Sequence, residues 1–279
     1  WHTATAFLAG VIFLVHPVQT QAVSYITQRF TSLCTLFYML SIFLYLIARV
    51  KLEKTQPSNT AYLIYALSIV STILAMKTKE IAFTIPFAVA VFEFLLFRNS
   101  LYSRRRFFFL IPFMASLVII PLSLLGPDWG IIKPGEGIAD VVRRDKLYDL
   151  YERSPFNYLF TQIRVIVTYI RLLFLPTNLK VVYDFKVSHS FFELKVMLSF
   201  ALLIMIAGYG IYAWKKASRV DPQDAPGYKL ISIGIVWFFL TLSIESSIIP
   251  IKDIIFEHRV YLPSFGFFAS CSVLLMRFV

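Results

Sequence analysis

The stretch Leu33–Ala48, with the sequence LCTLFYMLSIFLYLIA, contains no charged side chain. The rest of the chain repeats this pattern on both sides, because apolar blocks of 13 to 20 residues alternate with short charged segments. The core of a soluble protein shows a period of about 2 or 3.6 residues in its apolar positions instead. The blocks therefore predict an all-α, polytopic integral membrane protein.

Composition supports this prediction. The 279 residues are 58% hydrophobic and 15% charged, whereas soluble domains carry about 25% charged residues. This excludes a disordered chain, a fibrous chain, a solenoid and an ordinary soluble enzyme. The net charge of +11 would suggest nucleic acid in a soluble protein, but basic cytoplasmic loops explain it here, and no nucleic-acid partner is expected. The two cysteines, Cys34 and Cys271, lie in apolar stretches and predict neither a disulfide framework nor a metal site.

Eight apolar blocks predict about eight membrane spans, although several are shorter than the ~20 residues that cross a bilayer. The chain begins at Trp1 without a methionine and ends at Val279 within an apolar block. We therefore expect residues 1–279 to form a single transmembrane domain that is a piece of a longer protein. The predicted spans are 3–15, 33–48, 61–76, 81–97, 107–125, 196–214, 230–249 and 263–279.

A ninth apolar run, 159–175, is interrupted by Arg164 and Arg171. A set of short loops between the spans contains eleven basic and three acidic residues, and short basic loops stay on the cytoplasmic side of the membrane. All of these loops lie on the cytoplasmic side only if the ninth run does not cross the membrane. We therefore predict that 159–175 is a re-entrant or membrane-surface helix in an outer, periplasmic region over 126–195. In the same region, 140–153 predicts an amphipathic surface helix. The basic loop residues are Arg49, Lys51, Lys54, Arg98, Arg104, Arg105, Arg106, Lys215, Lys216, Arg219 and Lys229.

The polar residues beside the spans gather in four patches on the predicted outer face. Solvated loops, interfacial anchors and a structural salt bridge are the alternatives to a functional site. Ionisable residues in apolar segments are costly and usually functional, and an arginine fork matches phosphate oxygens. The patches are HPVQTQAVSYITQR (16–29), KTKE (77–80), the pair Arg164 and Arg171 two helical turns apart, and FEHRVYLP (256–263).

Two acidic residues lie within or near the end of apolar blocks. Glu93 is expected to face other helices, and Glu245 is expected to need a partner or a wet cavity.

Short motifs in these patches resemble the membrane part of the transmembrane and tetratricopeptide-repeat O-mannosyltransferases and their bacterial relatives. They occur in the same order and spread over nearly the whole chain. Each is weak alone, but four in sequence are fairly specific. The motifs are HPVQTQAV (16–23) followed by QR (28–29), KEIA (79–82) with Pro86, TQ (161–162) with YIRLL (169–173) and Pro176, and EHRVYLPS (257–264).

The resemblance implies a GT-C glycosyltransferase. Such an enzyme transfers a sugar, here expected to be mannose, from a polyprenyl phosphate to a protein Ser or Thr hydroxyl on the non-cytoplasmic side. It implies a bacterial cytoplasmic (inner) membrane with a periplasmic or exterior active face. It also implies a catalytic carboxylate before Trp1 and tetratricopeptide repeats after the membrane part. No cofactor or metal is expected if arginines supply the positive charge.

Each candidate residue receives a role on this interpretation. Cations would stabilise the charge that grows on the leaving phosphate, and polar neighbours would line the site. The expected phosphate-binding residues are Arg259, Arg171, Arg164 and Lys79. The expected site-lining residues are His16, Gln19, Arg29, Glu80, Glu257, His258 and Tyr261.

Three alternatives remain open at this point. The closest is a GT-C enzyme that acts on a lipid-linked glycan. A transporter or flippase for an anionic lipid or solute would show paired half-helices or inverted repeats near the midplane, and neither is visible. A non-catalytic membrane anchor for a repeat domain would tolerate Arg259→Ala without selective loss of function.

Overall fold

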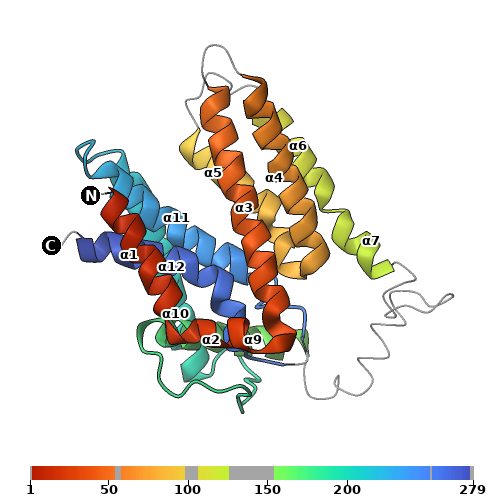
Figure 1. Ribbon diagram of the computed structural model, residues 1–279. Coiled ribbons are helices and arrows are strands. Elements are labelled where there is room, and N and C mark those ends of the chain that lie inside the picture. The colour runs from red at the N-terminus through yellow and green to blue at the C-terminus, as the bar shows by residue number, and fades with distance from the viewer. Residues whose placement is uncertain (1, 54–57, 98–105, 126–153, 252, 277–279) are drawn as a thin grey trace. The chain divides into compact units, whose positions relative to one another are not determined.

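The computed structural model of the chain describes residues 2–53, 58–97, 106–125, 154–251 and 253–276 (Figure 1). Within these ranges every regular element is an α-helix or a 3-10 helix. Five helices are long and apolar enough to cross a membrane, or six if the bent pair Thr3–Val15 and Pro17–Ser24 is one span. The predicted all-α membrane protein is confirmed, whereas the count of about eight spans and the GT-C arrangement stay predictions. The surface helix predicted at 140–153 lies outside the described residues.

The chain packs as two compact units, which we call the first and the second unit. The first unit combines residues 1–29 with 149–279, and the second unit contains residues 30–148. The chain thus enters the first unit, leaves it for the second and returns. A single transmembrane domain over 1–279 stays a prediction.

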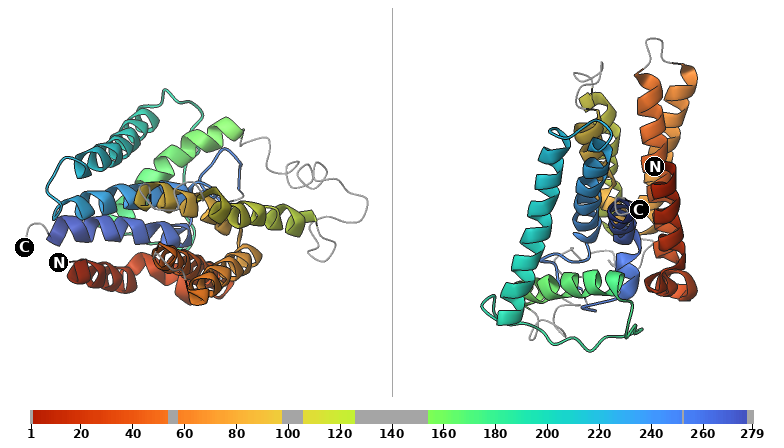
Figure 2. Two further views of the ribbon diagram at one scale, coloured as in Figure 1. Left: turned by 90° about the horizontal axis from the view of Figure 1, so that it is seen from above. Right: turned by 90° about the vertical axis from the view of Figure 1, so that its left-hand side faces the viewer.

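Four apolar helices form a layer in the first unit (Figure 2). In this layer α11 packs between α10 and α12, and α1 packs on α12. The 24 residues of α10 extend over ~36 Å at 1.5 Å per residue, so the segments before and after it lie far apart. The helices are α1 (His2–Val15), α10 (Leu194–Ala217), α11 (Ala225–Leu242) and α12 (Tyr261–Met276).

One end of this layer carries the shorter elements of the first unit. A further helix, α9 (Pro155–Phe174), runs crosswise to α10 and α11 at this end (Figure 2). Residues at the N-terminus of α9 determine where the helix begins. Pro155 occupies the first turn, and the Ser154 hydroxyl accepts the Asn157 N–H at 3.2 Å. This hydrogen bond satisfies one of the backbone donors that the first turn leaves without a helical partner. The helix predicted at 159–175 therefore exists, and α9 is not among the five candidate spans. The short elements are η1 (Pro17–Gln19), α2 (Thr20–Ser24), η2 (Ile26–Gln28) and η6 (Glu257–Val260).

The helices α11 and α12 cross at a contact between two glycines. A Cβ atom on Gly234 would overlap the Ser270 hydroxyl and the Gly266 carbonyl, and one on Gly266 would lie 2.6 Å from the Gly234 carbonyl oxygen. Beside the contact, Trp237 Nε1 donates to the Leu262 carbonyl at 3.0 Å. The small residues thus let the two backbones approach closely, as in many membrane helix pairs.

The block predicted to be helical over 230–249 ends earlier than expected. Helix α11 stops at Leu242, and residues 243–249 form turns. The Ser243 hydroxyl donates to the Leu240 carbonyl at 2.7 Å, and Pro250 follows. Serine hydroxyls that bond to nearby carbonyls compete with a regular helix ladder, so Glu245 lies in a turn rather than in a span.

The second unit contains shorter and interrupted helices. The predicted block 81–97 begins as a 3-10 helix, because Pro86 has no N–H and its ring crowds the carbonyl four residues before it. The predicted block 107–125 breaks at residues 117–118, four residues before Pro121, whereas Pro112 lies inside α6 without ending it. The elements are α3 (Arg29–Leu52), α4 (Asn59–Thr78), η3 (Glu80–Thr84), α5 (Ile85–Leu96), α6 (Arg106–Ser116) and α7 (Ile119–Leu125).

Hydroxyl groups and one buried ion pair connect the helices of the second unit. Ser41 and Thr72 join α3 to α4 through their hydroxyls at 2.7 Å. Arg49 on α3 and Glu93 on α5 form an ion pair at 2.6 Å with both side chains fully buried. The expectation that Glu93 faces other helices is confirmed. The prediction that Arg49 belongs to a basic loop is wrong, because α3 continues to Leu52 and the Arg49 side chain is buried beside Glu93 and two phenylalanine rings.

Candidate functional site

Two of the four polar patches meet at the α9 end of the first unit. Gln19 in η1 donates through Nε2 to the Ser264 hydroxyl at 2.9 Å. Gln21 in α2 accepts the His258 N–H through Oε1 at 2.7 Å, and the same oxygen lies 3.2 Å from His258 Nδ1. The sequence motifs at 16–23 and 257–264 therefore form one contact region, although neither motif could indicate its partner.

A segment without regular structure, residues 176–193, is attached to this region, and we call it the strap. The Glu257 carboxylate accepts the Lys180 N–H at 2.7 Å and the Tyr183 hydroxyl. Gln21 Nε2 donates to the Val181 carbonyl at 3.2 Å. Burial and the neighbouring Glu257 raise the pKa of Tyr183, so its hydroxyl remains a donor at neutral pH. Glu257 and Gln21 therefore both hold the start of the strap.

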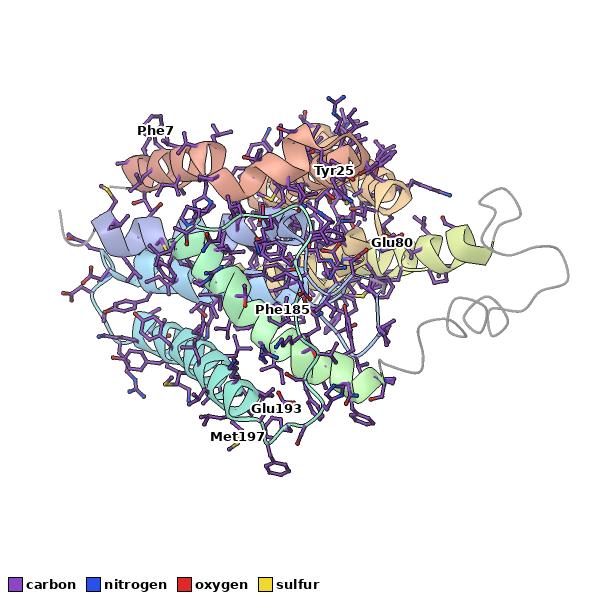
Figure 3. The ribbon with its side chains drawn as sticks, turned by 90° about the horizontal axis from the view of Figure 1, so that it is seen from below. Phe7, Tyr25, Glu80, Phe185, Glu193 and Met197 are labelled. Atoms are coloured by element: carbon purple, nitrogen blue, oxygen red, sulfur yellow. The ribbon has the colours of Figure 1, made fainter. Side chains whose placement is uncertain are left out.

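The other half of the strap is attached to α9. Arg164 Nη1 donates to the Lys186 carbonyl at 3.1 Å and to the Ser188 hydroxyl at 2.6 Å. The Ser188 N–H donates to the Thr161 hydroxyl at 2.9 Å. The Arg164 guanidinium also lies 4.9 Å from the centre of the Phe185 ring, and Figure 3 shows Phe185 beside α9. The charge of Arg164 is therefore directed at the protein's own backbone.

Arg259 closes the loop that precedes η6. The residue is 3% exposed, and its guanidinium donates to the Ile254 carbonyl at 3.2 Å and to the Asp253 carbonyl at 2.9 Å. Tyr158 and Glu245 lie within electrostatic range of it. The expectation that Glu245 needs a partner is met in this way. The buried guanidinium provides positive charge at the centre of the site and holds the loop in shape.

The face of α9 that packs inward is polar. Gln162 Nε2 donates to the Ile254 carbonyl at 2.9 Å, and the Tyr169 hydroxyl accepts the Phe256 N–H at 3.1 Å. Burial raises the pKa of Tyr169. The oxygen of the Gln162 amide is buried and accepts no hydrogen bond. A buried acceptor of this kind is costly unless a donor reaches it.

Arg171 differs from the other two arginines. It lies in the last turn of α9 with an exposed side chain. Arg171 lies close to Tyr183. Its positive charge lowers the pKa of Tyr183, whereas burial and Glu257 raise it. The two arginines predicted to share one helix face therefore have different environments. Arg164 is covered by the strap, whereas Arg171 remains accessible at its edge.

The remaining candidates of the first unit have packing or capping contacts. His16 Nδ1 accepts the N–H two residues further on at 3.3 Å and caps η1, and its ring lies 4.9 Å from that of Phe268. The Tyr261 ring packs edge-on against Phe13 at 5.3 Å. Arg29 is exposed at the first residue of α3. His16 and Tyr261 thus pack where α1 and η1 meet α12.

Lys79 and Glu80 belong to the second unit. Lys79 Nζ donates to the Thr31 hydroxyl at 3.0 Å, and Glu80 is exposed in the first turn of η3. A carboxylate near a helix start is favoured by the helix dipole. Their place in a shared site with Arg259 stays a prediction.

No group of three or more His, Cys, Asp or Glu side chains in the described ranges is arranged to hold a metal ion. The expectation that the protein needs no metal stays a prediction. No protein-family model, curated protein or solved structure matches the chain. The contacts of the first unit and the sequence motifs are therefore the basis for a function.

Several residues of the contact region were not among the predicted site residues. Gln21, Tyr158, Gln162 and Tyr169 all hydrogen-bond across it. Three of them share one α9 face at spacings of four and seven residues, and this spacing in an apolar run is a signal that the sequence contained. The roles of Lys180 and Tyr183 could not be found in this way, because nothing in an irregular segment indicates which way it folds.

Replacing Glu257 by glutamine is expected to loosen the start of the strap. Hydrogen bonds to a charged group contribute about 1.5–3 kcal/mol, against about 0.5–1.5 kcal/mol for neutral ones. Losing the charge should therefore accelerate amide exchange at residues 178–184 by about tenfold. Hydrogen–deuterium exchange of the full chain in detergent measures this directly.

Asp184→Asn is the matched control for this experiment. It removes the same charge from an exposed side chain of the strap, and exchange should stay at the wild-type rate. Equal rates in wild type and both variants would mean that Glu257 does not hold the strap.

Proposed function

We propose that the chain is the membrane part of a GT-C glycosyltransferase that uses a polyprenyl-phosphate sugar. The donor sugar in this proposal is mannose, and the acceptor is a Ser or Thr hydroxyl of a protein. The observation that carries the proposal is the meeting of the 16–23 and 257–264 motifs with the polar face of α9. Three separated motifs of one resemblance thus contribute to a single buried polar region.

The arginines divide into two roles in this proposal. Arg171 is exposed beside Tyr183, so its planar fork is accessible to the donor phosphate. Arg259 donates to a carbonyl of the loop before η6, and Arg164 donates to a carbonyl of the strap. They therefore keep these segments in shape and add positive charge to the site. Such preorganised charge favours a leaving phosphate in the transition state.

Other groups complete the proposed reaction. Exposed apolar side chains near Arg171, such as Phe174 and Leu175, offer contact for a prenyl chain. The base that removes the acceptor proton is a carboxylate before Trp1 on this proposal.

The proposed orientation places the α9 end on the non-cytoplasmic side of a bacterial inner membrane. Lys215, Lys216 and Arg219 lie at the far end of α10, away from the strap. Short basic loops remain in the cytoplasm, which supports a site on the opposite face.

Arg171→Ala is expected to lower the rate of sugar transfer by roughly 100-fold, because one charge-assisted contact to the leaving group is lost. The assay uses the full-length protein in nanodiscs with radiolabelled polyprenyl-phosphate mannose and a Ser/Thr-rich peptide. The loss should appear in kcat as well as in kcat/KM, because the contact strengthens as charge develops.

Two further variants separate binding from folding. Arg219→Ala removes an exposed arginine at the other end of α10 and should retain the wild-type rate. Arg259→Ala should abolish transfer and also accelerate amide exchange at residues 253–258, which Arg171→Ala should not do. If wild-type protein transfers no sugar from any of a panel of polyprenyl carriers, the enzyme proposal fails, and a transporter or anchor takes its place.

A further inference from the structure

The strap presents apolar side chains outward although it lies outside the membrane spans. Val181 is 60% exposed, Val182 is 70% exposed and Phe192 is 82% exposed. Scattered exposed apolar residues are normal on soluble proteins. Here they occupy one segment whose polar atoms are directed inward, toward Glu257, Gln21 and α9.

These side chains are held in place rather than free to turn inward. The Val181 carbonyl accepts from Gln21 at 3.2 Å, and the neighbouring Lys180 N–H bonds to Glu257 at 2.7 Å. At the far end, the Glu193 carboxylate accepts the His189 N–H at 2.7 Å. The strap therefore offers a preformed apolar edge, and preformed surfaces bind with a smaller loss of conformational entropy.

Charge and position indicate what this edge contacts. Lys180 and Lys186 are exposed on the same segment, with one exposed acidic residue, Asp184, between them. The Glu193 carboxylate is already bonded to backbone N–H groups. Helix α10, one of the candidate spans, starts at Leu194, two residues after Phe192. Phenylalanine, valine and lysine in this arrangement fit the boundary between acyl chains and headgroups, where apolar groups insert and lysines approach lipid phosphates.

We propose that the strap docks on the bilayer surface and binds the phosphates of anionic phospholipids through Lys180 and Lys186. Val181, Val182 and Phe192 insert below the headgroups and fix the depth of the strap. The strap then ties the contact region of α9 and η6 to the membrane surface at a defined height. This inference does not depend on the proposed sugar transfer.

The test measures the depth of two spin labels in the full chain, reconstituted in nanodiscs of phosphatidylcholine alone or with 30 mol% phosphatidylglycerol. Labels are placed at Val182→Cys or Phe192→Cys in a background with Cys34→Ala and Cys271→Ala. The control label is at Gln223→Cys, in the exposed loop at the other end of α10. Collision rates with oxygen and with a water-soluble nickel chelate report depth.

At positions 182 and 192 we expect oxygen to collide more often than the nickel chelate, and at 223 the reverse. If the chelate reaches 182 and 192 as readily as 223, the strap faces water and the proposal is overturned. Using two label positions ensures that the failure of one variant to fold does not decide the result.

The role of the lysines is tested in the same nanodiscs. Phosphatidylglycerol should increase the inserted fraction of the strap, by roughly fivefold for each lysine that contacts it. Lys180→Gln with Lys186→Gln should remove this increase, whereas Lys215→Gln with Arg219→Gln should leave it. Inorganic phosphate added to phosphatidylcholine nanodiscs should have no effect. An equal depth in both lipids, or an effect of free phosphate that matches that of the lipid, would overturn the assignment of headgroup binding.

Discussion

Glu93→Ala is expected to destabilise the second unit by about 3–5 kcal/mol, which is the usual cost of removing one partner of a buried ion pair. The Glu93 carboxylate accepts from Arg49 Nε at 2.7 Å and Nη2 at 2.6 Å, and from the Tyr45 hydroxyl at 2.6 Å. Without Glu93, the Arg49 guanidinium stays fully buried and loses both of its hydrogen bonds. Its Nη1 already has no hydrogen-bond partner.

The aromatic surroundings of Arg49 do not replace the carboxylate. The guanidinium lies 4.8 Å from the Phe97 ring centre and 4.7 Å from that of Phe109. A cation over an aromatic ring gains about 0.5–2 kcal/mol, which is less than the expected loss. Thermal unfolding of the full chain in one detergent, compared between wild type and variant, measures the change.

The triple variant Arg49→Met, Glu93→Leu and Tyr45→Phe is the control for this prediction, because it also removes the hydroxyl that bonds to Glu93. Replacing all partners of a buried ion pair by apolar residues of similar volume is often neutral, so the triple variant should unfold close to wild type. A single variant as stable as wild type would mean that the pair is solvated in the membrane protein and does not hold α3 to α5.

Gly234→Ala is expected to be the second most damaging single change, at about 3 kcal/mol, the upper end of the range for an overpacked core. The added methyl would overlap the Gly266 carbonyl as well as the Ser270 hydroxyl. A side chain can rotate away, but a backbone carbonyl inside α12 cannot do so without moving the helix. The α11–α12 contact and the Trp237 bond to Leu262 should weaken together.

Gly208→Ala supplies the matched control on α10. A Cβ atom there meets nothing within 4 Å, and alanine favours a helix over glycine by about 1 kcal/mol. The control should therefore unfold at the wild-type temperature or above it. If Gly234→Ala behaves in the same way, the two helices do not approach as closely as described.

Much of the fold could be predicted from the blocks of apolar residues. They give the all-α class, the positions of most helices and the buried environment of Glu93. They do not give helix ends, because Pro86, Pro121 and the serines after Leu242 change the backbone locally within an apolar block. They also could not reveal that Arg49 is buried, because a basic residue at the end of a block has the same pattern whether it faces lipid headgroups or another helix.

The candidate site could be predicted only in part. The patches at 16–29 and 256–263 and the pair Arg164 and Arg171 were identified by their polarity. The strap and the inward orientation of the polar α9 face were not. The sequence also does not indicate which arginines bond to the protein's own backbone. Arg259 and Arg164 donate to backbone carbonyls and Arg171 does not, a distinction that depends on the path of the loops around them.

The division of the first unit into two distant sequence segments has a consequence for biosynthesis. Gln21 and His258, which bond to each other, are 237 residues apart in sequence. At 5–20 residues per second, a ribosome needs roughly 10–50 s to make the chain between them. During this time α1 has no α12 to pack against, whereas residues 30–148 can already assemble on their own. Helix α1 is thus made long before its partner, and an insertase or chaperone that shields apolar helices would act on α1 during this interval.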